Sequence, residues 1–163
     1  MGRWPSGAVR KLGVSLRLVG LTATLERRFL RLHQFVYVRT DGRVGQGLVP
    51  GACSLLLRTT GRRTGLRRTN ALIYAMDAGS YVVVASNSAR AESPGWYFNL
   101  CADPRVELQV GCKRIAGLAL ALQEGELDYD RLWRLVNDGN RGRYDGYRRR
   151  TTRPIPLVVV QPV

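Results

Sequence analysis

The chain has 163 residues, the length of one domain that can bury a hydrophobic core without the help of disulfides. Hydrophobic residues make up 45% of it and charged residues 23%, which excludes a disordered protein and a coiled coil. The net charge is +14, and residues 1–76 hold most of it, with 14 basic and 2 acidic residues. We therefore expect the first half of the chain to face an anionic partner.

Cysteine and histidine usage argues against a metal centre. Cys53, Cys101 and Cys112 show no Cys-x-x-Cys spacing, and His33 is the only histidine. We therefore expect neither a zinc nor an iron site. An odd number of cysteines is typical of a reducing compartment, which predicts a cytoplasmic protein. The sequence has no run of 18 apolar residues, so it predicts no membrane-spanning helix.

Residues 1–38 form the first predicted unit, a basic amphipathic helix from about Ala8 to Val38. Apolar side chains recur in it at three- and four-residue steps, with arginines between them. Two interpretations stay open: a helix packed on the core with a solvated basic face, or a helix lying on the anionic inner face of the cell membrane. The segment 40–51 contains four glycines and Pro50 and is predicted to be a loop.

Residues 39–163 form the second predicted unit, a single cofactor-binding barrel domain. From Cys53 onward the spacing of apolar residues changes from that of a helix to that of a strand. Three strands are predicted over residues 53–60, 67–76 and 81–87. The connections between them are too short for a crossover helix, so the strands pair as antiparallel hairpins. A nucleotide-binding fold built on parallel strands is therefore not expected.

The rest of the chain predicts two short helices and three more strands. Ser93 and Pro94 begin a helix that runs through Leu100, and the acidic segment 124–130 begins another. Strands are predicted over residues 106–110, 115–122 and 155–160. Six strands linked mainly by hairpins predict a mainly β (α+β) fold, a small antiparallel barrel with an N-terminal amphipathic helix and short inserted helices.

The densest cluster of candidate binding residues lies within the segment 59–70. It holds four arginines around a glycine-bounded turn, so guanidinium groups, hydroxyls and backbone N–H groups can converge there on a phosphate or on several carboxylates. The alternative is a solvated hairpin tip. Because side chains alternate along a strand, only one of Arg67 and Arg68 can share a face with Asn70.

Two aromatic pairs follow. Trp96 and Tyr97 in the short helix fit core packing, whereas Tyr144 and Tyr147 lie in the arginine-rich segment 141–153. The second pair fits either the wall of a pocket for a flat anionic ligand or an exposed helical turn. No candidate nucleophile has a base beside it. An anion site with aromatic walls but no acid–base pair indicates that an organic cofactor supplies the chemistry.

Six segments in register carry a resemblance to a known family. They are Leu55–Gly65, Arg68–Leu72, Val83–Asn87, Pro94–Leu100, Asp103–Glu107 and Arg153–Pro156. Over about Leu55–Pro162 their order and spacing resemble the deazaflavin-dependent nitroreductase family of actinobacteria. The resemblance implies a split β-barrel like that of the flavin reductases, with reduced coenzyme F420 as the cofactor. It also implies that the helix before the barrel can lie near a membrane, where quinones are reduced.

The resemblance implies ten cofactor-binding residues. The arginines among them would hold the phosphate and the oligoglutamate tail of F420, the residues after the third strand would meet the edge of the ring, and a proline and a tryptophan would close over it. In chain order they are Arg62, Arg63, Thr64, Arg68, Asn70, Ala85, Ser86, Asn87, Pro94 and Trp96.

On the acceptor side the resemblance implies Tyr147, Tyr144 and Ser86 as candidate catalytic residues. The reaction would be hydride transfer from reduced F420 to a quinone, an enone or a nitro-aromatic compound, with the protein orienting the reactants and excluding water. Tyr147 is the first choice as proton donor. Gly95 replaces a larger residue at the pocket wall, and Arg141 and Arg150 stand where the nitroimidazole-activating member has aromatic residues, so we expect a wider and more basic acceptor pocket.

Alternative functions are an F420 carrier without turnover, an FMN-dependent enzyme of the same fold, and a basic nucleic-acid-binding barrel. FMN lacks the glutamate tail and so leaves the arginine cluster with less to bind. A nucleic-acid-binding barrel would interleave bases and exposed aromatics along several strands, whereas here the bases come early and the aromatics late. We therefore expect a small-molecule acceptor as the partner and no nucleic acid, and the sequence leaves an oligomer open.

Overall fold

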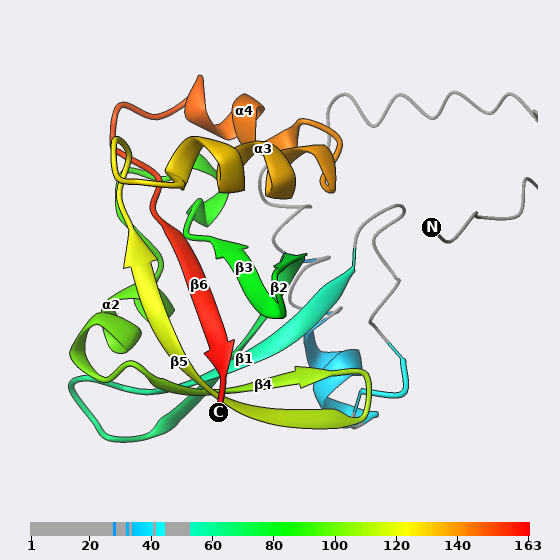
Figure 1. Cartoon of the computed structure of the whole chain (residues 1–163). Coiled ribbons are helices and arrows are strands. Elements are labelled where there is room, and N and C mark those ends of the chain that lie inside the picture. The colour runs from blue at the N-terminus through cyan, green and yellow to red at the C-terminus, as the bar shows by residue number, and fades with distance from the viewer. Residues whose placement is uncertain (1–27, 29–31, 33, 41, 45–52) are drawn as a thin grey trace, which may run out of the picture.

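The computed structural model describes residues 28, 32, 34–40, 42–44 and 53–163 (Figure 1). Six strands form a closed barrel in the order β1-β2-β3-β6-β5-β4, and each neighbouring pair is antiparallel, including the closing pair of β1 and β4. Their bounds are β1 Ser54–Thr60, β2 Arg67–Asp77, β3 Ser80–Val84, β4 Arg105–Val110, β5 Lys113–Leu122 and β6 Leu157–Pro162. The predicted six-stranded antiparallel barrel is confirmed.

The helices between the strands are η1 Asn87–Ala89, α2 Gly95–Ala102, α3 Tyr129–Asp138 and α4 Arg143–Arg148. Figure 1 shows α3 and α4 together above one end of the barrel, and α2 at the other side. Tyr144 and Tyr147 of α4 are buried, at 5% and 6% exposure. Their interpretation as an exposed helical turn is therefore wrong.

Alternation along the strands produces two hydrophobic cores. Val83 of β3 and Val158 of β6 point into the first core, which Trp96 of α2 helps to close. Val82 and Leu157, from the same two strands, point into the second core, which α3 and α4 cover. Because both faces of β3 and β6 are buried, these strands read as continuous apolar runs rather than as alternating ones.

Two predicted strand boundaries are wrong for one reason. The third strand ends at Val84 rather than at residue 87, and the last strand begins at Leu157 rather than at residue 155. The chain leaves the sheet where the Ala85 N–H donates to the carbonyl oxygen of Pro156 at 2.9 Å. Beyond this pair the carbonyl oxygens of Ala85 and Ser86 accept from the Arg153 guanidinium instead of from β6.

The predicted cap of the short helix is also wrong. Ser93 does not cap α2, because Pro94 itself is the N-cap residue, with extended backbone angles and no capping side chain. The second predicted helix begins at Tyr129, after most of the acidic segment, so that Asp130 is the acid in its first turn. Both helices therefore begin one to several residues later than the sequence pattern indicates.

Before the barrel, residues 34–39 are helical. Tyr37 is fully buried, and its hydroxyl donates to the Ser54 carbonyl at 3.2 Å and accepts from the Gly111 N–H at 3.0 Å. Most of the predicted helix over 8–38 and most of the predicted loop over 40–51 lie outside the described residues. No helix in the described part of the chain is long and apolar enough to cross a membrane.

Candidate active-site pocket

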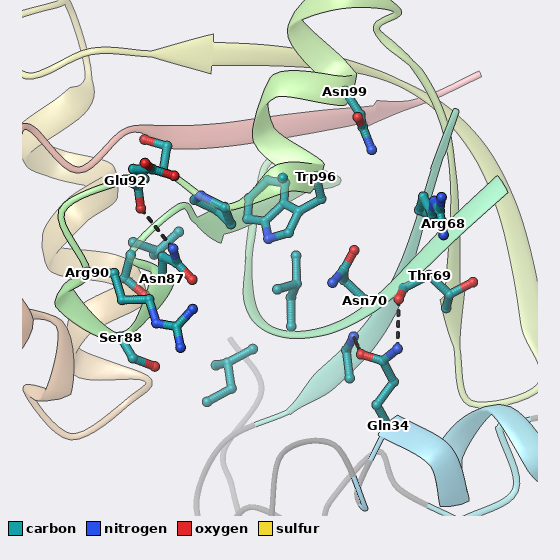
Figure 2. A pocket seen from close by; sticks show the side chains of 18 of the residues that line it. Gln34, Arg68, Thr69, Asn70, Asn87, Ser88, Arg90, Glu92, Trp96 and Asn99 are labelled. Carbon is teal, nitrogen blue, oxygen red and sulfur yellow. Dashed lines mark hydrogen bonds between the residues drawn. The ribbon is translucent and has the colours of Figure 1, made fainter. Parts of the chain in front are cut away.

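An open pocket of about 1210 Å³ lies between the hairpin of β1 and β2, the segment that follows β3, the start of α2 and the start of α4. Figure 2 shows Trp96 at its centre, with Arg68 and Arg90 on opposite sides. The volume exceeds that of a usual drug-sized site, so the pocket suits a long ligand.

The turn between β1 and β2 is closed by its own hydrogen bonds. The Gly61 N–H donates to the carbonyl of Leu66 at 2.9 Å, and the N–H groups of Thr64 and Gly65 donate to the Gly61 carbonyl at 3.1 and 2.7 Å. Gly65 has a φ of +66°, a left-handed conformation that favours glycine. Because these three N–H groups are used inside the turn, they are not available to an anion, and the arginine side chains are the main donors here.

Asn99 of α2 fixes this turn to the rest of the barrel. Its side-chain oxygen accepts from the Arg62 N–H at 3.2 Å, and its Nδ2 donates to the Thr59 hydroxyl at 3.1 Å. Asn99 is 7% exposed; its bond to Thr59 is buried and its bond to the Arg62 N–H is partly buried. Nothing in the sequence distinguishes this asparagine from a surface residue of a helix, and the sequence analysis missed it.

Three arginines of the hairpin line the pocket and a fourth does not. Arg62, Arg63 and Arg68 belong to the lining, and within the described residues none of the three forms an ion pair. Arg67 points to the other face of β2 and pairs with Glu107. The expected separation of Arg67 from Arg68 is confirmed, and Arg68 is the one that shares the pocket with Asn70.

The segment after β3 contributes Ser86, Asn87 and Ser88 to the opposite wall. Three successive residues, 87 to 89, have positive φ angles of 46°, 53° and 65° although none is a glycine. Such angles cost roughly 1–2 kcal/mol for each residue with a side chain. Among the described residues, the backbone N–H groups of Asn87 and Ser88 have no hydrogen-bond acceptor. They are free to donate to a ligand in the pocket.

Arg153 holds this segment in its strained conformation. Its guanidinium group donates to the carbonyl oxygens of Ala85 at 3.0 Å, Ser86 at 2.8 Å and Arg90 at 2.9 Å. Burial lowers the pKa of Arg153, yet an arginine stays charged at neutral pH. Since the carbonyls of Ala85 and Ser86 point toward Arg153, the N–H groups of the same two peptides, which belong to Ser86 and Asn87, point away from it.

The wall that we expect to face the acceptor contains Tyr144 and Tyr147, whose ring centroids lie 6.1 Å apart. Burial raises the pKa of Tyr144, the nearby Tyr147 adds to the increase, and Arg143 and Asn140 oppose it. The Tyr144 hydroxyl is therefore protonated at neutral pH. Arg150 lies over the Tyr147 ring at 5.0 Å.

The expected source of extra positive charge on the acceptor side is wrong. Neither Arg141 nor Arg150 lines the pocket, whereas Arg90 and Arg143 do. Among the described lining residues Glu92 is the single acid, against five arginines, so this part of the pocket is strongly basic.

Nearly all of the predicted site residues line this one pocket. The exception is Ala85, which is fully buried behind it and contributes backbone groups only. The lining includes the predicted residues Arg62, Arg63, Thr64, Arg68, Asn70, Ser86, Asn87, Pro94, Trp96, Tyr144 and Tyr147. Sequence reasoning missed Gln34, Asn99 and Asn140 as lining residues. It also missed Arg153, which holds the segment after β3.

The shape and charge of the pocket fit F420. This coenzyme carries a flat ring at one end and a phosphodiester with an oligoglutamate tail at the other, and the pocket combines Trp96 with three arginines that have no ion-pair partners among the described residues. A flavin would fill the ring site but would leave most of the arginine cluster without a ligand group. The residues present therefore fit the deazaflavin better than FMN.

The chain is similar to known F420-dependent proteins over most of its length. Residues 29–162 match the family model described as F420H(2)-dependent quinone reductase. An F420H(2)-dependent quinone reductase of Mycobacterium tuberculosis is 47% identical over 133 residues, which cover 82% of this chain and 89% of that protein. This agreement confirms the resemblance to the deazaflavin-dependent family.

Solved structures show the same fold. An F420-H2 dependent reductase, FDR-A, superposes with a TM-score of 0.59 at 34% identity and covers 66% of this chain and 93% of its own. An FMN-binding protein of Nostoc punctiforme related to pyridoxamine 5'-phosphate oxidase reaches a TM-score of 0.50 at 12% identity, over 78% of this chain and 79% of its own, and shares the fold alone. The matched segment, the 47% identity and the split barrel together place this chain in the F420H(2)-dependent quinone reductase family.

Proposed function

We propose that the chain reduces a quinone with reduced F420 and that the reaction takes place in the pocket around Trp96. The observation that carries the proposal is the position of Arg62, Arg63 and Arg68, which line that pocket without ion-pair partners among the described residues. A tail of carboxylates would supply the missing negative charges.

Each wall of the pocket has its own part in this function. When bound, the coenzyme supplies the hydride, and the chain orients it and excludes water. The hairpin arginines grip the tail, while Trp96 and Pro94 cover the ring. The N–H groups of Asn87 and Ser88 donate hydrogen bonds to the edge of the ring, where electron density changes during transfer.

The proton that completes quinone reduction has two candidate sources, Tyr147 and solvent. Tyr147 lines the pocket and lies at the acceptor side beside Tyr144. A tyrosine donates well only if its proton is replaced from water. The open mouth of the pocket allows such replacement, and we keep Tyr147 as the first choice, with Tyr144 and Ser86 as the other catalytic candidates.

A binding titration tests the proposal. We expect tight binding of F420, weak binding of FMN and no specific binding of single-stranded RNA, followed by rapid oxidation of reduced F420 by a menaquinone in stopped flow. Tight binding of FMN or of RNA with no affinity for F420 would refute the proposal. Binding of F420 without oxidation by any quinone, enone or nitro-aromatic compound would identify a carrier instead.

The arginines provide a sharper test with an internal control. We expect Arg63→Ala and Arg68→Ala to weaken F420 binding by about 1–3 kcal/mol each and to lower its dependence on salt. Arg67→Ala is the matched control, because Arg67 faces away from the pocket and pairs with Glu107. Equal effects of all three substitutions would show that only the overall charge matters.

Contact with a membrane and self-association belong to the same proposal. The described part of the first helix exposes Leu32, Phe35 and Val38 at three-residue spacing, a stripe that can meet the surface of an anionic membrane at its cytoplasmic face. A structural neighbour at 28% identity and a TM-score of 0.62 is a domain-swapped dimer, which supports examining this chain for a dimer. Vesicle flotation and sedimentation would decide these two points.

A further inference from the structure

Asn140, in the connection between α3 and α4, has a polar group without a partner. The residue is 5% exposed and lines the pocket, and its Nδ2 forms no hydrogen bond with any residue that the structure describes. A buried donor without an acceptor costs roughly 1–3 kcal/mol. Native proteins rarely accept this cost without a function or a ligand that removes it.

The neighbouring Asn137 shows what a structural asparagine looks like at this place. Its Nδ2 donates to Asp145 at 2.7 Å, and its Oδ1 accepts from the N–H groups of Tyr144 and Asp145 at 3.1 and 3.2 Å. Asn137 therefore holds α4 in position with every polar atom satisfied. Asn140 is equally buried but does not share this role.

The surroundings of Asn140 indicate which ligand its amide would meet. The Tyr144 hydroxyl lies beside the amide, without hydrogen-bond geometry to its Nδ2. Burial keeps this hydroxyl protonated, so the two groups offer two hydrogen-bond donors. Arg143 and Arg90 add positive charge to the same part of the pocket, and Glu92 is the one acid among the lining residues.

The position of Asn140 in the pocket separates it from the part proposed for the coenzyme tail. That part is the hairpin with Arg68, and Figure 2 places Arg68 and Arg90 on opposite sides of Trp96. Asn140 belongs with the Arg90 side, because its carbonyl accepts from the first N–H of α4, that of Arg143, at 3.2 Å, and α4 packs against η1, which Arg90 caps. A ligand that reaches Asn140 is therefore the electron acceptor rather than the coenzyme tail.

We propose that Asn140 Nδ2, together with the Tyr144 hydroxyl, donates hydrogen bonds to an oxygen of the electron acceptor. The acceptors of this site would then be compounds with a carbonyl oxygen conjugated to the reacting carbon, as in quinones. This inference rests on the proposed function and assigns a binding group to its second substrate.

The chemistry explains why two donors help. A quinone that takes up a hydride gains two electrons and one proton, and the negative charge develops on its oxygen. The Asn140 amide and the Tyr144 hydroxyl lower the energy of that oxyanion. A second proton, delivered from Tyr147 or water, then completes the hydroquinone, so that charge and atoms balance.

The test compares two acceptors in stopped-flow oxidation of reduced F420. One is menadione, which has the carbonyl oxygens, and the other is methylene blue, which accepts a hydride and has no oxygen. We expect Asn140→Leu and Asn140→Asp to lower kcat/KM for menadione about 10–100-fold, as for the loss of a hydrogen bond to a developing charge, and to change that for methylene blue less than twofold. Asn137→Leu is the structural control and should lower thermal stability while affecting both acceptors equally.

Each outcome has one meaning. Unchanged menadione kinetics in Asn140→Leu would overturn the inference, and equal losses for the two acceptors would overturn it as well by showing a general defect. A titration of F420 fluorescence checks that the variant binds the coenzyme as tightly as the unaltered chain. If the unaltered chain itself fails to oxidise reduced F420, the proposed function is wrong, which is a distinct result.

Discussion

Replacing Arg153 with methionine tests whether this arginine holds residues 87–89 in their left-handed conformation, and how much it contributes to the stability of the barrel. The substitution keeps much of the aliphatic stem and removes the donors that hold the carbonyls of Ala85, Ser86, Arg90 and Pro154. At about 1 kcal/mol for each net hydrogen bond, the four bonds contribute on the order of 4 kcal/mol. The three left-handed residues that follow Ser86 cost about 3–6 kcal/mol.

Because these two magnitudes are similar, we expect the segment to relax instead of the barrel unfolding. The urea midpoint of Arg153→Met should correspond to a loss of about 1–2 kcal/mol, since local relaxation recovers much of the strain. The Asn87 N–H would no longer be held in its orientation, because the carbonyl of the same peptide, that of Ser86, would lose its bond to Arg153. We therefore expect F420 affinity to fall more than tenfold, a larger effect than the loss of stability.

Fluorescence titration of F420 and urea unfolding measure the two quantities. Added guanidinium ion at low concentration should restore part of the affinity in Arg153→Ala, where a cavity remains for it. Arg153→Met with unchanged affinity would refute the reasoning, because the strained segment would then keep its conformation without the arginine. A loss of stability near 4 kcal/mol would equally refute it, because the segment would then not have relaxed.

Three further substitutions follow from described contacts. Asn99→Ala should lower the free energy of unfolding in urea by about 1–3 kcal/mol, since it removes one buried and one partly buried hydrogen bond; a change under 0.5 kcal/mol would contradict this. The Arg131 guanidinium lowers the pKa of Asp77 below 3.8, so its ion pair stabilises the fold above that pH and is lost as the pH falls through the lowered value. Asp77→Asn should therefore be less stable at pH 7 and equal to the unaltered chain in strong acid. Because burial raises the pKa of Tyr144, Tyr144→Phe should change quinone reduction by the same factor at pH 6 and pH 9.

The strand pattern could be predicted because hairpins leave a local signal. Ala78 and Gly79 both have positive φ in a two-residue connection, and such turns fix the register of the strands that they join. The alternation that separated Arg67 from Arg68 is a local property of the same kind. Six strands and the arginine side of the pocket followed from it.

The supports of the pocket could not be predicted, because each depends on a contact between distant residues. Asn99 reaches the hairpin across 37 positions, and Arg153 reaches Ser86 across 67. No periodicity marks either residue. The positive φ angles after Ser86 were equally invisible, since the sequence has neither glycine nor proline between 87 and 90. The burial of Tyr144 and Tyr147 could not be predicted, because their neighbours in the sequence are arginines. In the structure Arg143, Arg149 and Arg150 are exposed, whereas the two tyrosines point inward.

The hydroxyl of Tyr37 has a consequence for the closure of the barrel. Direct pairing between β1 and β4 spans three residue pairs, and two residues further along each strand the Tyr37 hydroxyl bonds to both Ser54 and Gly111, where the strands have no direct pair. A side chain from the segment before the barrel therefore completes the junction between β1 and β4. A chain shortened to begin after residue 38 would lose the Tyr37 hydroxyl. Hydrogen exchange of the Gly111 amide should then become faster, by a larger factor than exchange of any amide of β2.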